Sequence, residues 1–137
     1  MNKVFVLFLM LSVVFGVSAQ KKKQIKAYLD YKSFYEPSIG NYVEIQLQFV
    51  GHSIQYIGTE NGSLQGEIAV KLSLLQNDSL VVSDAYRLQS PIMRDSIVED
   101  FYDIKRFAVK PGVYSLEISI QDLNLNGKAM EGKLVLE

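Results

Sequence analysis

The sequence predicts an all-β fold, an antiparallel immunoglobulin-like β-sandwich of about eight strands, behind a short N-terminal leader. Three observations support this fold class. Apolar and polar residues alternate at period two in several segments, turn-forming residues separate these segments at short intervals, and no segment sustains helical spacing. The chain has 137 residues, enough for one domain with one hydrophobic core.

Three segments alternate clearly, with apolar side chains on one face and polar side chains on the other. This pattern is typical of a strand that is buried on one side, and it occurs in Val43–Phe49, Leu64–Leu74 and Tyr114–Ile120. Further segments alternate in part and contain β-branched or aromatic residues. We predict weaker strands at Ile25–Tyr31, Ser53–Ile57, Leu80–Leu88, Phe101–Val109 and Lys128–Leu136.

Turn-forming residues lie between these strands. Two dipeptides predict type I′ hairpin turns, because Asn and Gly accept positive φ at little steric cost: Asn61-Gly62 and Asn126-Gly127. Pro followed by Gly within Lys110–Val113 predicts a type II turn. Residues 34–41 and 89–99 are too long for simple hairpins, so we expect loops there, where a sandwich usually carries its binding residues.

Residues 1–19 have the three parts of a signal peptide. Lys3 supplies the positive charge, Val4–Val17 is apolar, and Val17-Ser18-Ala19 provides small residues for cleavage. An uncleaved membrane anchor is the alternative, but the apolar run is shorter than the about 20 residues that cross a bilayer. We therefore expect residues 20–137 to form the β-sandwich domain of a periplasmic or secreted protein, without stable membrane insertion after cleavage.

Charge and cysteine content exclude several functional classes. The formal net charge of the chain is −1, and removal of Lys3 with the leader makes it one unit more negative. No strong positive field is therefore present to attract nucleic acid. Because the sequence has no Cys, it has neither a disulfide framework nor a thiolate for catalysis or metal binding. We expect no nucleic-acid partner and no cofactor.

One segment resembles half of a calcium-binding loop. Asp122–Gly127 places oxygen-bearing side chains at alternate positions, as the first half of a helix-loop-helix calcium loop does. The second half does not fit, because the twelfth position, where a bidentate Glu belongs, is Lys133. The flanking segments also alternate as strands rather than helices. We therefore expect a hairpin and no metal site.

Candidate catalytic residues are few. His52 is the only histidine, and it stands beside Ser53 in a stretch without nucleophile-elbow spacing. Four carboxylates follow later in the chain, enough for a general acid and base: Asp95, Glu99, Asp100 and Asp103. Catalytic carboxylates must face each other across a cleft, and proximity in sequence does not provide that geometry. We expect a locally hydrogen-bonded histidine, a solvated acidic edge and no catalytic residues.

Aromatic residues gather near the start of the expected mature chain: Tyr28, Tyr31, Phe34, Tyr35 and Tyr42. Several of them facing outward together could stack on a sugar or grip a peptide. We expect instead that most of them pack in the core or cover its end. Asn61-Gly62-Ser63 and Asn77-Asp78-Ser79 are glycosylation sequons, which matter only in a eukaryotic secretory host.

Several stretches together resemble a known family: Ala27-Tyr28-Leu29-Asp30-Tyr31, Phe34-Tyr35, Asn41-Tyr42-Val43-Glu44-Ile45 and Pro111–Ile120. The sequence resembles the N-terminal β-sandwich region of the GWxTD-domain proteins, exported proteins of Gram-negative envelopes, over nearly all of the mature chain. In that family the Gly-Trp-x-Thr-Asp motif lies in a second, C-terminal domain, and this chain has no Trp. The resemblance implies either a fragment of a two-domain protein, which we favour, or a short relative, and it implies no functional residues.

Two functions from different classes follow. The leading hypothesis is a non-catalytic interaction module that docks a neighbouring domain or an envelope protein through the longer loops or a sheet edge. The alternative is a small secreted hydrolase that uses His52, Ser53 and the acids, or a carbohydrate-binding domain that uses the N-terminal tyrosines. If a second domain adjoins the sandwich, the surface of residues 128–137 should be unusually apolar, with Val135 facing outward and Leu134 facing the core.

Overall fold

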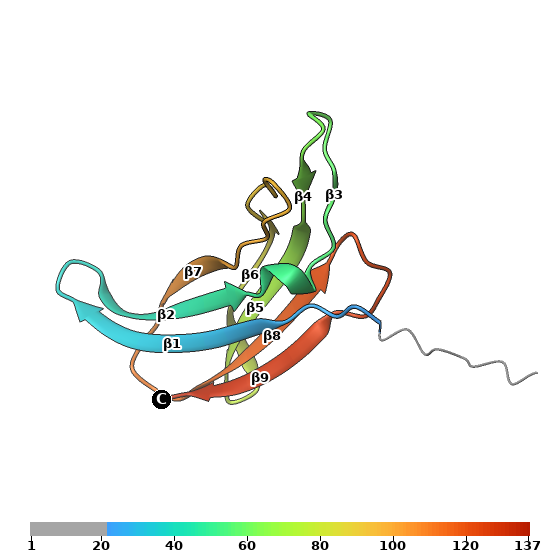
Figure 1. Ribbon diagram of the computed structural model, residues 1–137. Coiled ribbons are helices and arrows are strands. Elements are labelled where there is room, and N and C mark those ends of the chain that lie inside the picture. The colour runs from blue at the N-terminus through green and yellow to red at the C-terminus, as the bar shows by residue number, and fades with distance from the viewer. Residues whose placement is uncertain (1–21) are drawn as a thin grey trace, which may run out of the picture.

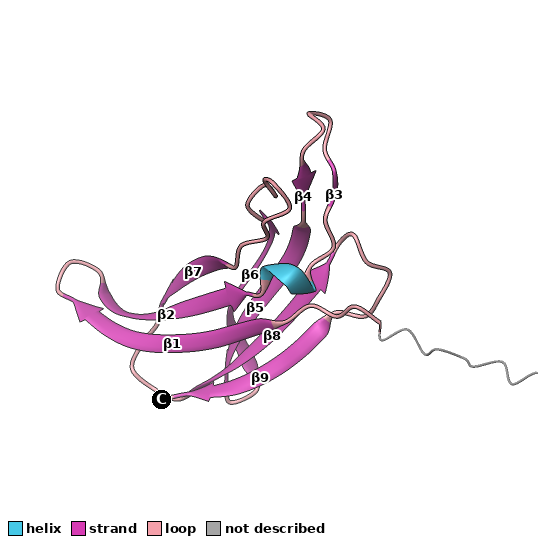
Figure 2. Ribbon diagram, in the orientation of Figure 1, coloured by secondary structure: helices cyan, strands magenta, loops and turns pink. Residues whose placement is uncertain are grey.

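The computed structural model describes residues 22–137, so the predicted signal peptide lies outside the described residues. One 3-10 turn, η1 (Gly51–Ser53), follows the second strand. The strands are β1 (Ala27–Glu36), β2 (Gly40–Phe49), β3 (Ile57–Gly58), β4 (Leu64–Gln65), β5 (Glu67–Gln76), β6 (Ser79–Gln89), β7 (Phe101–Ala108), β8 (Tyr114–Asp122) and β9 (Met130–Leu136) (Figures 1 and 2). Within this range, no helix has the length and hydropathy of a membrane span.

Seven of the strands form two antiparallel sheets. One sheet has the order β1-β2-β7, the other has the order β6-β5-β8-β9, and β3 and β4 form a separate short hairpin (Figure 1). Pairing of β2 with β7, and of β5 with β8, joins strands that are distant in the chain, as in the Greek-key connections of immunoglobulin-like sandwiches. The predicted all-β sandwich is therefore confirmed.

The core lies between the two sheets and consists of the apolar positions of the alternating segments. Burial of each large apolar side chain contributes about 1.5–3 kcal/mol relative to exposure. The rings of Phe49 and Phe101 stack at one end, with centroids 5.1 Å apart. The central strands contribute the most deeply buried residues: Ile45, Leu47 and Phe49 from β2, Ile68, Val70, Leu72 and Leu74 from β5, and Leu116 and Ile120 from β8.

A tyrosine corner fixes the crossing from β7 to β8. Tyr114 is buried at the start of β8, and its hydroxyl donates a hydrogen bond to the carbonyl oxygen of Lys110 at 2.7 Å. This contact is a hallmark of immunoglobulin-like sandwiches. Gly112, between them, has φ +154°, far from the about +80° of a type II turn, so that turn prediction is wrong.

The segment predicted as one strand at Leu64–Leu74 is two strands, because the chain bends at Gly66. The N–H of Gly66 donates to Oγ of Ser90 at 2.9 Å, and its carbonyl accepts from the N–H of Ser90, also at 2.9 Å. This pair of bonds to Ser90 separates β4 from β5. Leu64 therefore leaves the core face and is 41% exposed.

Two other predicted boundaries also change. The expected strand at Ser53–Ile57 is instead the end of η1, an extended connection and the two-residue strand β3. The expected loop at residues 34–41 is mostly strand, because β1 and β2 continue as one hairpin as far as the pair Glu36 and Gly40. Gly40 has φ +90°, a conformation that glycine accepts and that allows the chain to reverse within Pro37–Ile39.

The pairs of positive φ values typical of type I′ turns occur at two places other than the predicted ones, Asn77-Asp78 and Asp95-Ser96. Asn77 and Asp78 have φ of 51° and 61° and join β5 to β6 as a two-residue loop. At Asn61-Gly62 only the glycine has positive φ. At Asn126-Gly127 neither residue has positive φ, so that prediction is wrong.

Candidate functional site

The lone histidine and its neighbouring serine do not form a nucleophilic pair. Ser53 is buried, its Oγ donates to the carbonyl of Val50 at 2.6 Å, and the same Oγ accepts the N–H of Lys26 at 2.8 Å. His52 is exposed on η1 and has no hydrogen bond to Ser53. The Ser53 hydroxyl therefore joins the start of β1 to η1 and has no base to activate it.

The four acids of the expected acidic edge do not all lie together. Asp95 lies in a tight turn with φ 51°, whereas Asp100 accepts the N–H of Gly51 at 2.9 Å. Asp103 faces β6 from β7 and accepts a hydrogen bond from the hydroxyl of Tyr86. Asp95 and Glu99 line one surface pocket of about 380 Å³ together with Arg94, and neither Asp100 nor Asp103 lines it. Among residues 22–137, no group of three acids or histidines is placed to hold a metal ion.

A polar clasp of four side chains closes one open side of the sandwich, where β6 and β7 are the edge strands. We use this name for Asp84 and Tyr86 on β6 with Asp103 and Lys105 on β7. Nζ of Lys105 lies 3.2 Å from Oδ2 of Asp84 and 3.9 Å from the ring centroid of Tyr86. Burial, together with the bond to Asp103, raises the pKa of the Tyr86 hydroxyl well above its ordinary value.

The clasp predicts that stability falls at high pH. A tyrosine titrates at about pH 10 in the unfolded chain, whereas Tyr86 keeps its proton in the folded chain. The contribution of Tyr86 to folding stability is therefore complete below pH 10, and it is lost as the pH rises towards the pKa of Tyr86 in the folded chain. Urea unfolding at pH 8 to 11 should show the native chain losing stability faster than Tyr86→Phe. Parallel curves for the two proteins would contradict the clasp, and Tyr102→Phe, which removes an exposed hydroxyl, is the control.

The calcium-like segment at residues 122–127 makes hydrogen bonds that hold the β8–β9 loop in place. Asp122 is 4% exposed, and its two carboxylate oxygens accept the N–H of Gln55 at 2.7 Å and that of Asn124 at 2.9 Å. The side-chain amide of Asn124 donates to the carbonyl of Gln55 at 3.0 Å. The two bonds with Gln55 fasten the β8–β9 loop to the chain after η1, and the bond between Asn124 and Asp122 shapes the loop itself. Together they use both carboxylate oxygens of Asp122, the first residue of the calcium-like segment.

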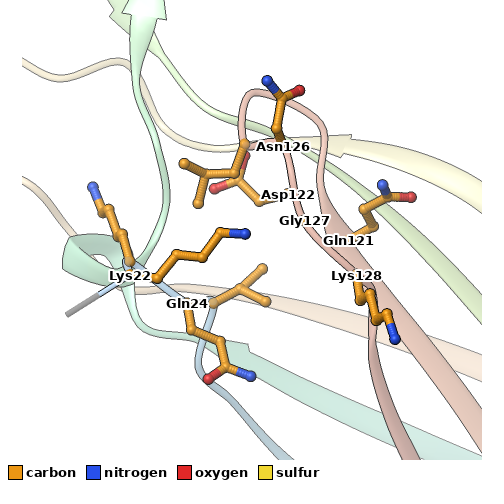
Figure 3. A pocket seen from close by; sticks show the side chains of 10 residues that line it. Lys22, Gln24, Gln121, Asp122, Asn126, Gly127 and Lys128 are labelled. Carbon is orange, nitrogen blue, oxygen red and sulfur yellow. The ribbon is translucent and has the colours of Figure 1, made fainter. Parts of the chain in front are cut away.

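A pocket of about 420 Å³ lies between the start of the described chain and the β8–β9 loop (Figure 3). Figure 3 shows Lys22 and Lys128 on opposite sides of it, with their side chains directed away from each other. Nζ of Lys23 donates to the carbonyl of Ile54 at 2.6 Å. Binding of a single anion would require the amino groups to converge on one point. Here they do not.

The other open side of the sandwich lies between β1 and β9. Strand β9 pairs with β8 along one edge, and within residues 22–137 no strand pairs with its other edge. Leu134, on the core-facing side, is 39% exposed, and Val135, on the outer side, is 54% exposed. One long hydrogen bond reaches across to β1, in which the N–H of Glu137 donates to the hydroxyl of Tyr31 at 3.5 Å.

The charged side chains of β9 contact β8. Oε1 of Glu131 accepts a hydrogen bond from Ser119 at 2.9 Å, and Nζ of Lys133 lies 3.4 Å from Oε1 of Glu117. Charges on an edge strand normally discourage pairing with another chain. Here the contacts with β8 direct the side chains of Glu131 and Lys133 across the outer face of the sheet, away from the free edge. The side chains beside the free backbone of β9 are then those of Leu134 and Val135.

The N-terminal aromatic residues do not mostly pack in the core, so that expectation is wrong. Only Tyr31 packs against the core cluster, whereas Tyr28 is 63% exposed and Tyr35 is 68% exposed. Small and aliphatic residues occupy the other core-facing positions of β1, and this phase turns Tyr28 and Phe34 outward. Tyr35 has the core-facing phase but lies near the hairpin end, which projects beyond the second sheet (Figure 1).

The outer face of the β1-β2-β7 sheet therefore carries exposed aromatic residues, and we call it the aromatic face. Three of its rows cross all three strands in register: Tyr28 with Gln48 and Tyr102, Asp30 with Gln46 and Ile104, and Lys32 with Glu44 and Arg106. A fourth row consists of Phe34 on β1 and Tyr42 on β2. Sequence reasoning missed Tyr102 and Ile104. The available signal was the alternation along β7. Tyr102 and Ile104 alternate with residues that are buried or half-buried, namely Phe101, Asp103, Lys105 and Phe107.

Comparison of the chain with protein-family models, with curated proteins and with solved structures finds no match.

Proposed function

We propose that the chain is a non-catalytic docking module that binds an extended segment of a protein partner by strand addition along β9. The observation that carries the proposal is the free edge of β9, flanked by exposed Leu134 and Val135. In strand addition, backbone hydrogen bonds supply affinity, and alternate side chains supply specificity on the two faces of the sheet. An incoming strand would cover Leu134 on one face and Val135 on the other.

The edge of β9 is better suited to docking than the long loop that joins β6 to β7. That loop is tied back to β4, because the N–H of Met93 donates to the carbonyl of Leu64 at 2.9 Å. A further backbone bond, from Ile97 to Arg94 at 2.8 Å, closes the loop on itself. The opposite edge strands, β6 and β7, contact each other through the polar clasp. The edge of β9 is therefore freer of competing contacts than the edges of β6 and β7.

Strand addition is tested with peptides of seven residues selected by phage display against the mature chain. Val135→Lys places a charge beside the free edge and should weaken the selected peptides by about tenfold or more. The matched control is Val81→Lys on edge strand β6, where the side chain is 48% exposed and the change should have no effect. Bound peptide should also slow amide hydrogen exchange in β9. Protection of β1 or of residues 90–100, without protection of β9, would contradict the proposal.

The proposal includes the setting of the module. We place it in an exported envelope protein, because the leader-like residues 1–19 and the resemblance to the GWxTD-domain proteins both favour export. In that layout a second domain follows the sandwich and uses it as a positioning element. The reading frame beyond the codon for Glu137 tests this part. A frame that leads into Gly-Trp-x-Thr-Asp supports it, and an immediate stop codon contradicts the two-domain layout.

A further inference from the structure

The aromatic face differs in chemistry from the outer face of the second sheet. On β5 and β8 the outward residues are small, polar or charged, such as Ser73, Glu117 and Ser119. On the aromatic face, Tyr28 and Tyr102 are 63% and 68% exposed, and Ile104 is 48% exposed. Exposed apolar side chains that gather on one face of a small protein usually mark a binding surface. The first sheet therefore has an outer surface with exposed aromatic and apolar side chains, whereas the outward residues of β5 and β8 form a polar surface.

One row of the aromatic face places two tyrosines on either side of an amide. Tyr28 on β1 and Tyr102 on β7 are both in register with Gln48 on the central strand. Two strand spacings separate the tyrosines, which is about 10 Å. Nε2 of Gln48 lies 3.4 Å from Oδ2 of Asp100, so its amide oxygen is free to accept a hydrogen bond from a ligand. The row thus offers two aromatic surfaces with a polar group between them.

The rest of the face is polar in its middle and aromatic at its far end. Oε2 of Glu44 lies 2.8 Å from Nε of Arg106, and Oε1 accepts from Gln46 at 2.7 Å. These bonds, of which the one from Gln46 is the larger cause, lower the pKa of the Glu44 carboxyl. Beyond them the rings of Phe34 and Tyr42 stack with centroids 5.3 Å apart. Aromatic surfaces therefore lie at both ends of a hydrogen-bonding strip.

Size and charge together select the kind of ligand. The rows from Tyr28 to Phe34 extend six residues along β1, about 20 Å, and the three strands are about 10 Å across. The resulting strip is about twice as long as it is wide, which suits a linear ligand. Asp30 and Glu44 balance the charges of Lys32 and Arg106, which favours an uncharged ligand. A narrow, neutral, linear ligand fits these limits.

We propose that the aromatic face binds an uncharged glycan chain, with two of its sugar rings, not adjacent in the chain, stacked on Tyr28 and Tyr102. The C–H faces of a sugar pack against aromatic rings, while its hydroxyls exchange hydrogen bonds with amides such as those of Gln48 and Gln46. The spacing of the tyrosines lets each ring contact a different sugar of the same chain. This site is separate from the edge of β9, so the module binds glycan on one sheet and protein at the edge of the other.

Affinity electrophoresis of the mature chain tests the proposal, with soluble neutral β-glucan, mannan and galactan cast separately into native gels. At least one polysaccharide should slow migration, and calorimetry with its hexasaccharide should then give the affinity. Tyr28→Ala and Tyr102→Ala should each weaken binding by about tenfold or more, because each removes one stacking surface. The matched control is Tyr35→Ala, whose side chain is also 68% exposed but lies on the opposite face of the β1–β2 hairpin.

Three outcomes would overturn the glycan site. Migration that is unchanged in all three polysaccharides is the first, and equal loss of binding in Tyr35→Ala is the second. The third is loss of peptide binding, with polysaccharide binding intact, in Tyr28→Ala and Tyr102→Ala, which would make the face a protein interface. Val135→Lys should leave polysaccharide binding unchanged, so failure of strand addition at β9 is distinguishable from failure of the glycan site. Circular dichroism checks that each variant remains folded.

Discussion

Replacement of Gly51 by alanine is expected to destabilise the fold by about 3 kcal/mol, which is a large part of the about 5–15 kcal/mol that stabilises a typical domain. A Cβ at this position would overlap the carbonyl oxygen of Glu99 and would lie 2.8 Å from Cγ1 of Val98. The first obstacle is backbone, so it cannot move aside by changing rotamer. The N–H of Gly51 also donates to Asp100, which holds the two segments at this short distance.

Urea unfolding followed by circular dichroism measures this effect as a shift of the midpoint at constant m-value. The matched controls are Gly58→Ala and Gly127→Ala, because neither glycine has positive φ and an added Cβ would meet no atom within 4 Å at either position. Both controls should change stability by less than about 1 kcal/mol. A Gly51→Ala protein as stable as these controls would show that η1 and the segment before β7 do not pack as closely as described.

Replacement of Asp122 by alanine should cost about 3 kcal/mol. The change leaves the N–H groups of Gln55 and Asn124 without their acceptor, and each unsatisfied buried donor costs about 1–3 kcal/mol. It also removes one of the two hydrogen bonds that hold the β8–β9 loop to the chain that follows η1. Urea unfolding gives the size of the loss. Proteolysis of residues 123–129, detected by mass spectrometry, should become faster in the variant because the loop opens more often.

Asn126→Ala is the matched control for Asp122→Ala, because both residues belong to the calcium-like segment but Asn126 is exposed. Its expected effect is below about 0.5 kcal/mol. If both substitutions had equal effects, the loop would not depend on the carboxylate of Asp122. Equal midpoints for the native chain and Asp122→Ala would contradict the assigned hydrogen bonds directly.

The alternation of residue types determined most of the fold. In Val43–Phe49 and Tyr114–Ile120 the apolar set has period two, and only a strand places such residues on one face. The structure buries these sets between the sheets, as with Ile45 and Leu116, which have no exposed surface. Turn-forming residues between these segments favoured hairpins as the connections between consecutive strands. The sandwich class followed from these local properties, because each segment needs a second layer to cover its apolar face.

The exact turns could not be predicted, because tertiary contacts select among conformations that local sequence permits. Asn126-Gly127 accepts the φ values of a type I′ turn, yet the hydrogen bonds of Asp122 hold the loop in another shape. Gly66 lies in the middle of an alternating run, and only its bonds to Ser90 show where the strand must break. Asp122 is held by Gln55, and Gln55 and Ser90 are both distant in sequence from the turns that they affect, so no local pattern contained them.

The candidate sites depended even more on the tertiary structure. The sequence determined that the chain has one histidine, no cysteine and an N-terminal group of aromatic residues, and these facts limited the chemistry available. It did not determine that Tyr28 lies in register with Tyr102, or that β9 keeps a free edge. Strand order and register come from pairing between distant segments, and a shift of one residue would turn Tyr28 and Tyr102 to the other face. The sequence therefore determined which side chains are available, and only the packed sheets decided which of them meet.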